Sequence, residues 1–104
     1  MLTGRNAAMS KNEILETLKA LRQELETRYK VKAISLFGSF VRGEETATSD
    51  IDVLVEFGAE ASYFDVVRLG DFLEEKLQRP VDVIPQGALR AELREAVLRE
   101  RVTV

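Results

Sequence analysis

Two short apolar segments, 31–37 and 51–57, constrain the fold more than any other feature of the chain. Both are rich in β-branched and aliphatic residues, and a glycine follows each of them, which is typical of buried strands. Two further apolar segments, 81–84 and 102–104, extend the pattern along the chain. The sequence therefore predicts a small sheet of three to four strands.

Three amphipathic segments are predicted to be helices that flank this sheet. The first begins with a capping box formed by Ser10 and Glu13, and its apolar residues recur three and four positions apart until Lys30. The second has Ser62 as its cap and ends before Pro80, because proline disfavours helix at the residue that precedes it. The third spans 89–98, and the connection 40–49 is expected to hold a short helical turn followed by a loop.

The order of these elements predicts the strand directions. If 31–37 and 51–57 are antiparallel, the first strand ends close to where the second begins, which brings Ser39 near Asp50 and Asp52. The helix between 51–57 and 81–84 is a crossover of the kind that joins parallel strands. The expected fold is an α/β (α+β) domain with a mixed sheet flanked by helices. It should occupy residues 10–104, after a flexible tail of residues 1–9.

Composition narrows the possible chemistry. The 104 residues carry a net charge of -3 without a strongly basic region, so we expect no direct nucleic-acid binding. The chain has no cysteine and no histidine, so any metal must be held by oxygen, which favours Mg²⁺ or Mn²⁺. No apolar run is long enough to span a membrane and no secretory signal is evident, so we expect a cytoplasmic location.

Three aspartates are expected to meet at one edge of the sheet. Asp50 and Asp52 alternate with an apolar neighbour at the start of their strand, so they point to the same side. Asp82 is the second residue of the parallel strand 81–84, and parallel strands begin at the same end of a sheet. It should therefore lie about 5 Å from the first pair. Clustered carboxylates repel one another, and a divalent cation between them would relieve that repulsion.

The end of the first strand offers a complementary anion site. Gly38 and Ser39 can present backbone N–H groups and a hydroxyl to a phosphate. Ser39 could also serve only as a helix cap, a role that does not exclude the other. Arg42 could either contact a phosphate or pair with the acidic residues at 44–45.

Metal-binding carboxylates opposite a phosphate cradle predict chemistry on a nucleoside triphosphate. Such a cluster suits two-metal phosphoryl or nucleotidyl transfer, in which two cations stabilise the attacking and leaving oxygens. Asp50 and Asp52 would hold a cation together with the triphosphate, and all three aspartates would hold the second. Because histidine is absent, Asp82 is the candidate proton acceptor, and activation of the hydroxyl by the metal alone is the alternative.

The same residues carry a family resemblance. Gly38-Ser39, followed after ten residues by Asp50-Ile51-Asp52, resembles the signature of the DNA polymerase β-like nucleotidyltransferase superfamily. The short chain, with G-S-F-V-R-G, S-D-I-D-V-L-V and V-D-V-I, resembles the minimal nucleotidyltransferases, which are antitoxin subunits encoded beside HEPN-domain RNase toxins. The resemblance covers roughly residues 10–100, and the paired motif at its fixed spacing is far more specific than either half alone.

The resemblance implies a specific activity. Its members use Mg²⁺ and ATP, and some transfer AMP to a tyrosine hydroxyl of the partner toxin. By position, Ser39 would contact the triphosphate, Asp50 and Asp52 would ligate metal, and Asp82 would be the third acidic residue. Larger relatives have a further domain that binds the acceptor, so a HEPN-type partner protein would supply the acceptor here.

Two other functions remain compatible with the sequence. The chain could neutralise its partner by binding alone, as a catalytically passive antitoxin, or it could modify a small molecule. Tyr63 and Phe64 are interpreted as core or interface residues rather than a stacking platform for bases, because the few aromatics are not interleaved with basic residues.

Overall fold

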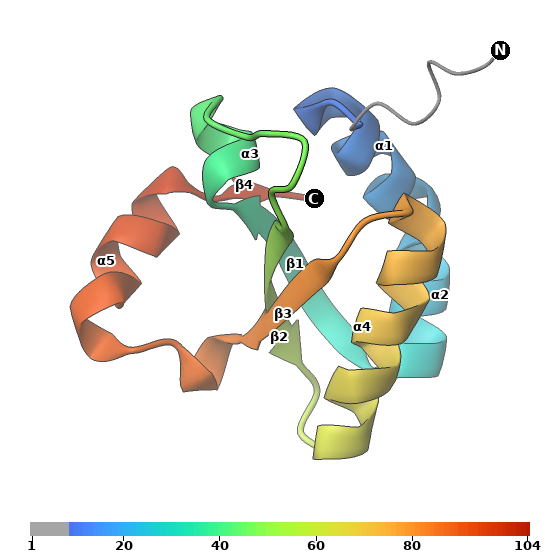
Figure 1. Ribbon diagram of the computed structural model, residues 1–104. Helices are drawn as coiled ribbons and strands as arrows, with labels where there is room; N and C mark the ends of the chain where they lie inside the picture. The colour runs from blue at the N-terminus through green and yellow to red at the C-terminus, as the bar shows by residue number, and fades with distance from the viewer. Residues whose placement is uncertain (1–8) are drawn as a thin grey trace, which may run out of the picture.

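The computed structural model describes residues 9–104 as a mixed four-stranded sheet with helices on both faces (Figure 1). The helices are α1 (Lys11–Ala20), α2 (Arg22–Tyr29), α3 (Ser39–Arg42), α4 (Tyr63–Leu77) and α5 (Ala91–Glu100), with a 3₁₀ turn at Gln86–Ala88. The strands are β1 (Val31–Phe37), β2 (Ile51–Phe57), β3 (Val81–Pro85) and β4 (Val102–Thr103). The predicted α/β fold is confirmed.

The strand directions are also as predicted. The spatial order is β3-β2-β1-β4, in which β1 runs antiparallel to β2 and β4, while β2 and β3 are parallel. The short segment β4 lies at the edge beside β1, with Ser35 opposite Thr103. Because β2 and β3 are parallel, both strands begin at the same end of the sheet, close to where β1 ends.

Helices α1, α2 and α4 gather on one face of the sheet, and α5 lies on the other (Figure 1). Side chains alternate along β2, so Ile51, Val53 and Val55 enter the main core with α1, α2 and α4. On the opposite face, Leu54 packs in a smaller cluster with Val97 of α5. Residues of β2 that share a face with Leu54 therefore look toward α5.

The caps of two helices form as predicted. At α1, the Ser10 N–H donates to Glu13 Oε1 over 2.8 Å, and the Glu13 N–H donates to Ser10 Oγ over 3.1 Å. At α4, the Ser62 N–H donates to the Asp65 carboxylate over 2.8 Å. These side chains satisfy N–H groups that have no partner within the helix.

The prediction of one uninterrupted helix up to Lys30 is wrong in one detail. The segment divides at Leu21, whose ψ of 1° departs from helical geometry, although its N–H still donates to Thr17 O over 3.1 Å. The Leu25 N–H then donates to Leu21 O over 2.9 Å, so the two helices follow one another almost in line. Apolar periodicity continues across such a local break, which is why the sequence pattern does not reveal it.

Most of the N-terminal segment lies outside the part of the chain that the structure describes. The predicted flexible tail, 1–9, lies outside the described residues except for Met9, which packs against the main core. Among residues 9–104, none of the helices has the length and apolar character needed to cross a membrane.

Candidate functional site

Asp52 and Asp82 lie side by side at the end of the sheet where β2 and β3 begin. They are register partners in the parallel pair, and both belong to the face that looks toward α5. On the other side of β2, Asp52 pairs with Phe37, the last residue of β1. Asp50 precedes β2 and is exposed to solvent. The topology therefore brings two of the three predicted carboxylates together from strands thirty positions apart in sequence.

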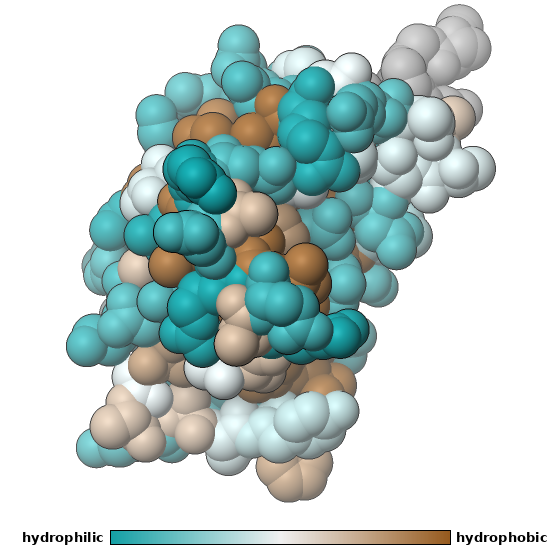
Figure 2. Space-filling model, turned by 90° about the vertical axis from the view of Figure 1, so that its left-hand side faces the viewer, coloured by the Kyte–Doolittle hydropathy of each residue, from teal (hydrophilic) through white to brown (hydrophobic). Residues whose placement is uncertain are grey.

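A pocket of about 280 Å³ opens between this end of the sheet and α5. Asp52 and Asp82 supply its carboxylates, and its other walls come mainly from apolar side chains. The other lining residues are Phe37, Ile84, Ala88, Leu89, Arg90, Leu93 and Val97. Figure 2 views the molecule from the side of α5, where areas of hydrophobic residues lie among hydrophilic ones. The pocket thus has two carboxylates among mainly apolar lining residues.

The electrostatics of Asp52 follow from this position. Partial burial raises its pKa above the ordinary value of 3.8, because the charged form loses hydration. The negative charges of Asp82 and then Asp50 raise this pKa further, whereas Arg42 acts in the opposite direction. The negative charges of Asp82 and Asp50 therefore act together on the carboxylate of Asp52.

The residues present fit a divalent cation. Their donor atoms are carboxylate oxygens, the ligands that Mg²⁺ and Mn²⁺ prefer. Gly38 leaves the space that Asp52 occupies: a Cβ at Gly38 would overlap Asp52 Oδ2 and lie 3.2 Å from its Cγ. In the described part of the chain, however, no group of three acidic side chains is arranged to hold a metal as it stands. A shared site for Asp50, Asp52 and Asp82 therefore stays a prediction.

The glycine and serine of the motif occupy adjacent but different positions. Gly38 is the N-cap of α3, with φ +84° and ψ -152°, a conformation available almost only to glycine. Ser39 is the first residue of α3 and is partly exposed. The alternative that Ser39 serves as the helix cap is therefore wrong, because Gly38 holds that position. Contact of Gly38 and Ser39 with a phosphate stays a prediction.

Arg42 pairs with two acidic residues. Its Nε donates to Glu44 Oε1 over 2.9 Å, as one of the two alternatives anticipated. Its Nη1 also contacts both carboxylate oxygens of Glu100, at 3.2 and 3.1 Å. These carboxylates raise the pKa of the Arg42 guanidinium, the hydrogen bond to Glu44 most strongly. The sequence did not indicate Glu100 as a site residue, because no local pattern links it to Arg42, which is 58 residues away.

Arg79 is a second residue of the site that the sequence analysis did not identify. Its Nη1 donates to the carbonyl oxygens of Ser49 and Ala47 over 2.6 and 3.1 Å, and its guanidinium lies over the Phe40 ring. Arg79 thereby holds the loop that leads into Asp50. The position of Arg79 just before Pro80 was the only signal, and it indicated no more than a helix end.

The opposite end of β2 carries different features. Tyr63 and Phe64 are 78% and 77% exposed, so their assignment to the core is wrong, and an interface role stays a prediction.

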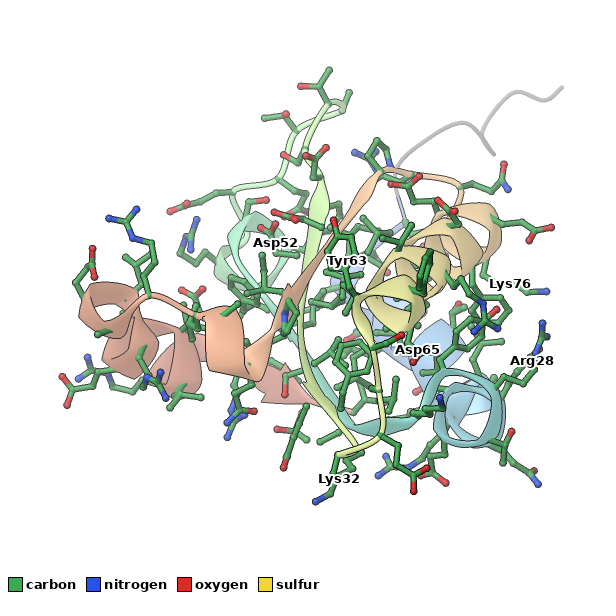
Figure 3. The ribbon with its side chains drawn as sticks, turned by 90° about the horizontal axis from the view of Figure 1, so that it is seen from below. Arg28, Lys32, Asp52, Tyr63, Asp65 and Lys76 are labelled. Carbon is green, nitrogen blue, oxygen red and sulfur yellow. The ribbon has the colours of Figure 1, made fainter. Side chains whose placement is uncertain are left out.

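Asp65 is only 3% exposed and contacts Lys30 and Arg68 at 3.5 and 3.2 Å. Figure 3 shows Asp65 on the side of α4 and α2, whereas Asp52 lies across the sheet near α3. The Asp65 ion pairs therefore belong to the α2–α4 contact and not to the pocket.

Comparison with known sequences places this geometry in context. The sequence model of the nucleotidyltransferase domain family matches residues 18–104. Protein adenylyltransferase MntA of Thermococcus cleftensis is 38% identical over 98 residues, which cover 94% of this chain and 99% of that protein. A Methanocaldococcus jannaschii protein, MJ1215, provisionally named a protein adenylyltransferase, is 42% identical over 88 residues, covering 85% of this chain and all of its own.

Solved structures agree with the sequence comparison. One that is provisionally described as a minimal nucleotidyltransferase has a TM-score of 0.74 at 37% identity, covering 92% of this chain and 97% of its own. A Shewanella oneidensis complex of a tri-AMPylated HEPN toxin with MNT antitoxin includes a chain with a TM-score of 0.63 at 22% identity. That match covers 91% of this chain and 71% of the other, and it shows likeness of fold alone. The chain belongs to the nucleotidyltransferase domain family, as a minimal nucleotidyltransferase.

Proposed function

We propose that this nucleotidyltransferase moves AMP from ATP to a hydroxyl group of a HEPN-type partner protein, with Mg²⁺ or Mn²⁺ as cofactor, and so acts as an antitoxin. The observation that carries the proposal is the adjacency of Asp52 and Asp82 beside the Gly38 turn. The relatives named protein adenylyltransferases support the choice of a protein acceptor.

Each residue of the site has a role that its position suits. Asp50 and Asp52 would hold a cation with the triphosphate, and Asp82 would join them in holding a second. When bound, the cations would supply charge neutralisation at the phosphates and lower the pKa of the attacking hydroxyl. Gly38 N–H and Ser39 Oγ would bind and orient the phosphates, which is the largest part of catalysis in phosphoryl transfer.

The reaction itself is an in-line displacement. The acceptor oxygen forms a bond to the α-phosphorus of ATP, and the bond from that phosphorus to the bridging oxygen of pyrophosphate breaks. The acceptor loses its proton to the carboxylate of Asp82, and pyrophosphate leaves with the electron pair of the broken bond. An acceptor seated against the apolar pocket wall beside the carboxylates would exclude water, which otherwise competes with the acceptor for AMP.

A tyrosine hydroxyl of the partner is the proposed acceptor. The S. oneidensis complex contains an AMPylated HEPN toxin, and that toxin is bound to a chain with the same fold as this one. The pocket of about 280 Å³ beside Asp52 and Asp82 would leave room for a side chain delivered by another protein. A binary complex of this chain with a HEPN protein is therefore the expected working form.

Intact-mass measurement tests the proposal directly. The protein, a HEPN partner, ATP and Mg²⁺ are incubated together, and the partner should gain the mass of one or more adenylyl groups. The paired substitution Asp50→Asn with Asp52→Asn should abolish that gain. Asp71→Asn, which removes an exposed carboxylate from α4, is the matched control and should leave labelling unchanged.

Two results would argue against the proposal. Absence of added mass with the native chain would remove the adenylyltransferase activity. Protection of cells from the partner by the double Asn variant, at the level of the native chain, would favour an antitoxin that acts by binding alone.

A further inference from the structure

Glu100, the last residue of α5, places its carboxylate on Gly38 and Arg42, two of the residues that the sequence motif assigns to a phosphate. The Gly38 N–H donates to Glu100 Oε2 over 2.9 Å, and Arg42 Nη1 contacts the two oxygens of the same carboxylate at 3.1 and 3.2 Å. The Glu100 side chain is 24% exposed, so the contact lies partly out of solvent. One acidic side chain thus engages both a backbone donor and a cation that a phosphate would use.

Carboxylates and phosphates are bound by the same groups. Both present oxygen pairs that accept charge-assisted hydrogen bonds from backbone N–H groups and guanidinium groups. An incoming triphosphate at the Gly38 turn would meet donors that are already occupied, and its charge would be repelled by the Glu100 carboxylate. Binding of the nucleotide at this turn and retention of the Glu100 contacts are therefore mutually exclusive.

We propose that Glu100 is an internal competitor of the nucleotide, and that ATP enters only when the Glu100 side chain leaves Gly38 and Arg42. This inference rests on the proposed function, since it concerns the regulation of the same site. Departure of Glu100 frees Arg42 Nη1 and the Gly38 N–H together, while Arg42 Nε stays paired with Glu44, so two donors become available to phosphate in one step. The competitor therefore sets the apparent affinity for nucleotide.

The surrounding structure allows this movement at small cost. Glu100 ends α5 two residues before β4, and the backbone that follows it is held independently of its side chain. The Arg101 N–H donates to Val97 O over 3.0 Å, and the Val104 N–H donates to Ile34 O over 3.0 Å. A change of side-chain rotamer at Glu100 can release the donors while α5 and β4 keep their places.

The simpler alternative is that Glu100 only fastens α5 to the turn after β1. The two roles differ in their consequences for ligand binding. A fastening residue contributes to stability, and its loss would leave nucleotide affinity unchanged or reduce it. A competitor opposes the nucleotide, and its loss must raise nucleotide affinity without raising the affinity for Mg²⁺ alone.

Isothermal titration calorimetry on Glu100→Gln separates the two roles. Glutamine keeps the size of the side chain but removes the charge, and Mg²⁺-ATP is expected to bind about three- to tenfold more tightly than to the native chain. Titration with Mg²⁺ alone should show no gain, because a negative charge near the carboxylates has been lost. Glu95→Gln removes one charge from an exposed position of the same helix and should change neither affinity.

A second variant keeps the test valid if the glutamine variant unfolds. Glu100→Asp retains the charge but is one methylene shorter, so it should hold Gly38 and Arg42 less well and again raise the affinity for Mg²⁺-ATP. Combining Arg42→Ala with Glu100→Gln should reduce the gain, because part of it depends on the released guanidinium. Thermal unfolding of each variant reports any loss of fold.

The outcomes are distinguishable from those of the proposed function. Equal or weaker binding of Mg²⁺-ATP by the glutamine and aspartate variants, with measurable binding by the native chain, overturns the competitor and leaves the nucleotide site intact. Failure of the native chain and of every Glu100 variant to bind Mg²⁺-ATP overturns both, because then there is no nucleotide site to regulate. An equal gain in the Glu95 control assigns the effect to net charge and overturns the competitor.

Discussion

Asp52 and Asp82 are direct register partners across the parallel strands β2 and β3, so their carboxylates share one face at one end of the sheet. Neither residue has an opposite charge in its own strand. The arrangement keeps two like charges beside each other next to an apolar wall, which is unfavourable for the free protein. Such a cost is expected where a site is shaped for a ligand and not for stability.

Asp52→Asn should stabilise the protein at neutral pH while it removes activity. The folded state raises the pKa of Asp52, so it binds a proton more readily than the unfolded chain does. Native stability therefore falls as pH rises from the ordinary value of 3.8 through the higher folded pKa, and it stays lower above that window. Urea unfolding from pH 3 to 8 should show that the variant becomes more stable relative to the native chain as pH rises. A constant difference across this range would contradict the expectation.

Gly38→Ala should damage both stability and nucleotide binding. An alanine there must adopt φ +84° with ψ -152°, which costs about 1–3 kcal/mol, and its Cβ must displace the Asp52 carboxylate. Gly87→Ala is the control, because that glycine has neither a positive φ nor an atom within 4 Å of an added Cβ. Chemical unfolding of both variants, with calorimetry for Mg²⁺-ATP, checks the contrast. Equal stability of the two would show that the turn can relax.

Arg79→Ala should weaken the site by releasing the loop before Asp50. Loss of a charged donor to backbone carbonyls is expected to cost about 1–2 kcal/mol of stability. Mg²⁺ affinity should fall as well, because Asp50 is no longer held in place. Arg99→Ala, at an exposed position of α5, is the control for loss of an arginine. Unchanged Mg²⁺ affinity in Arg79→Ala would restrict the role of this residue to stability.

Asp65→Asn should destabilise the protein with a pH dependence opposite to that of Asp52. The hydrogen bond from Ser62 N–H lowers the pKa of Asp65 most strongly, with help from Lys30. Its contribution to stability is complete above the ordinary value of 3.8 and is lost as pH falls through the lower folded pKa. Thermal unfolding at pH 7 and pH 2 should therefore show a larger difference in stability between the native chain and the variant at pH 7 than at pH 2. A similar difference at both pH values would mean that the charge of Asp65 is unimportant.

Mg²⁺ should raise the melting temperature of the native chain. A ligand that binds only the folded state at a hundred times its Kd adds about 2.7 kcal/mol of stability. The shift should disappear in the Asp50→Asn and Asp52→Asn double variant, and EDTA should reverse it in the native chain. A shift that survives in the double variant would place the cation elsewhere on the protein.

Local patterns in the sequence were sufficient to predict most of the fold. The capping residues Ser10 and Ser62, the glycine after β1 and the apolar alternation in β2 all act over a few positions. The motif from Gly38 to Asp52, with the crossover to β3, also predicted that Asp82 would lie beside Asp52. Parallel strands joined by a helix start at the same end of a sheet, so this long-range neighbour followed from topology alone.

The tertiary structure decided what surrounds the carboxylates. Glu100 contacts Gly38, which is 62 residues away in the sequence, and Arg79 holds the loop before Asp50. Both contacts form because the strand order places the end of α5 and the segment after α4 at the same end of the domain. The exposure of Tyr63 and Phe64 and the break at Leu21 likewise depend on how the helices pack. Propensity and periodicity are properties of neighbouring residues, whereas the burial and pairing of a charged side chain depend on which distant segments pack against it.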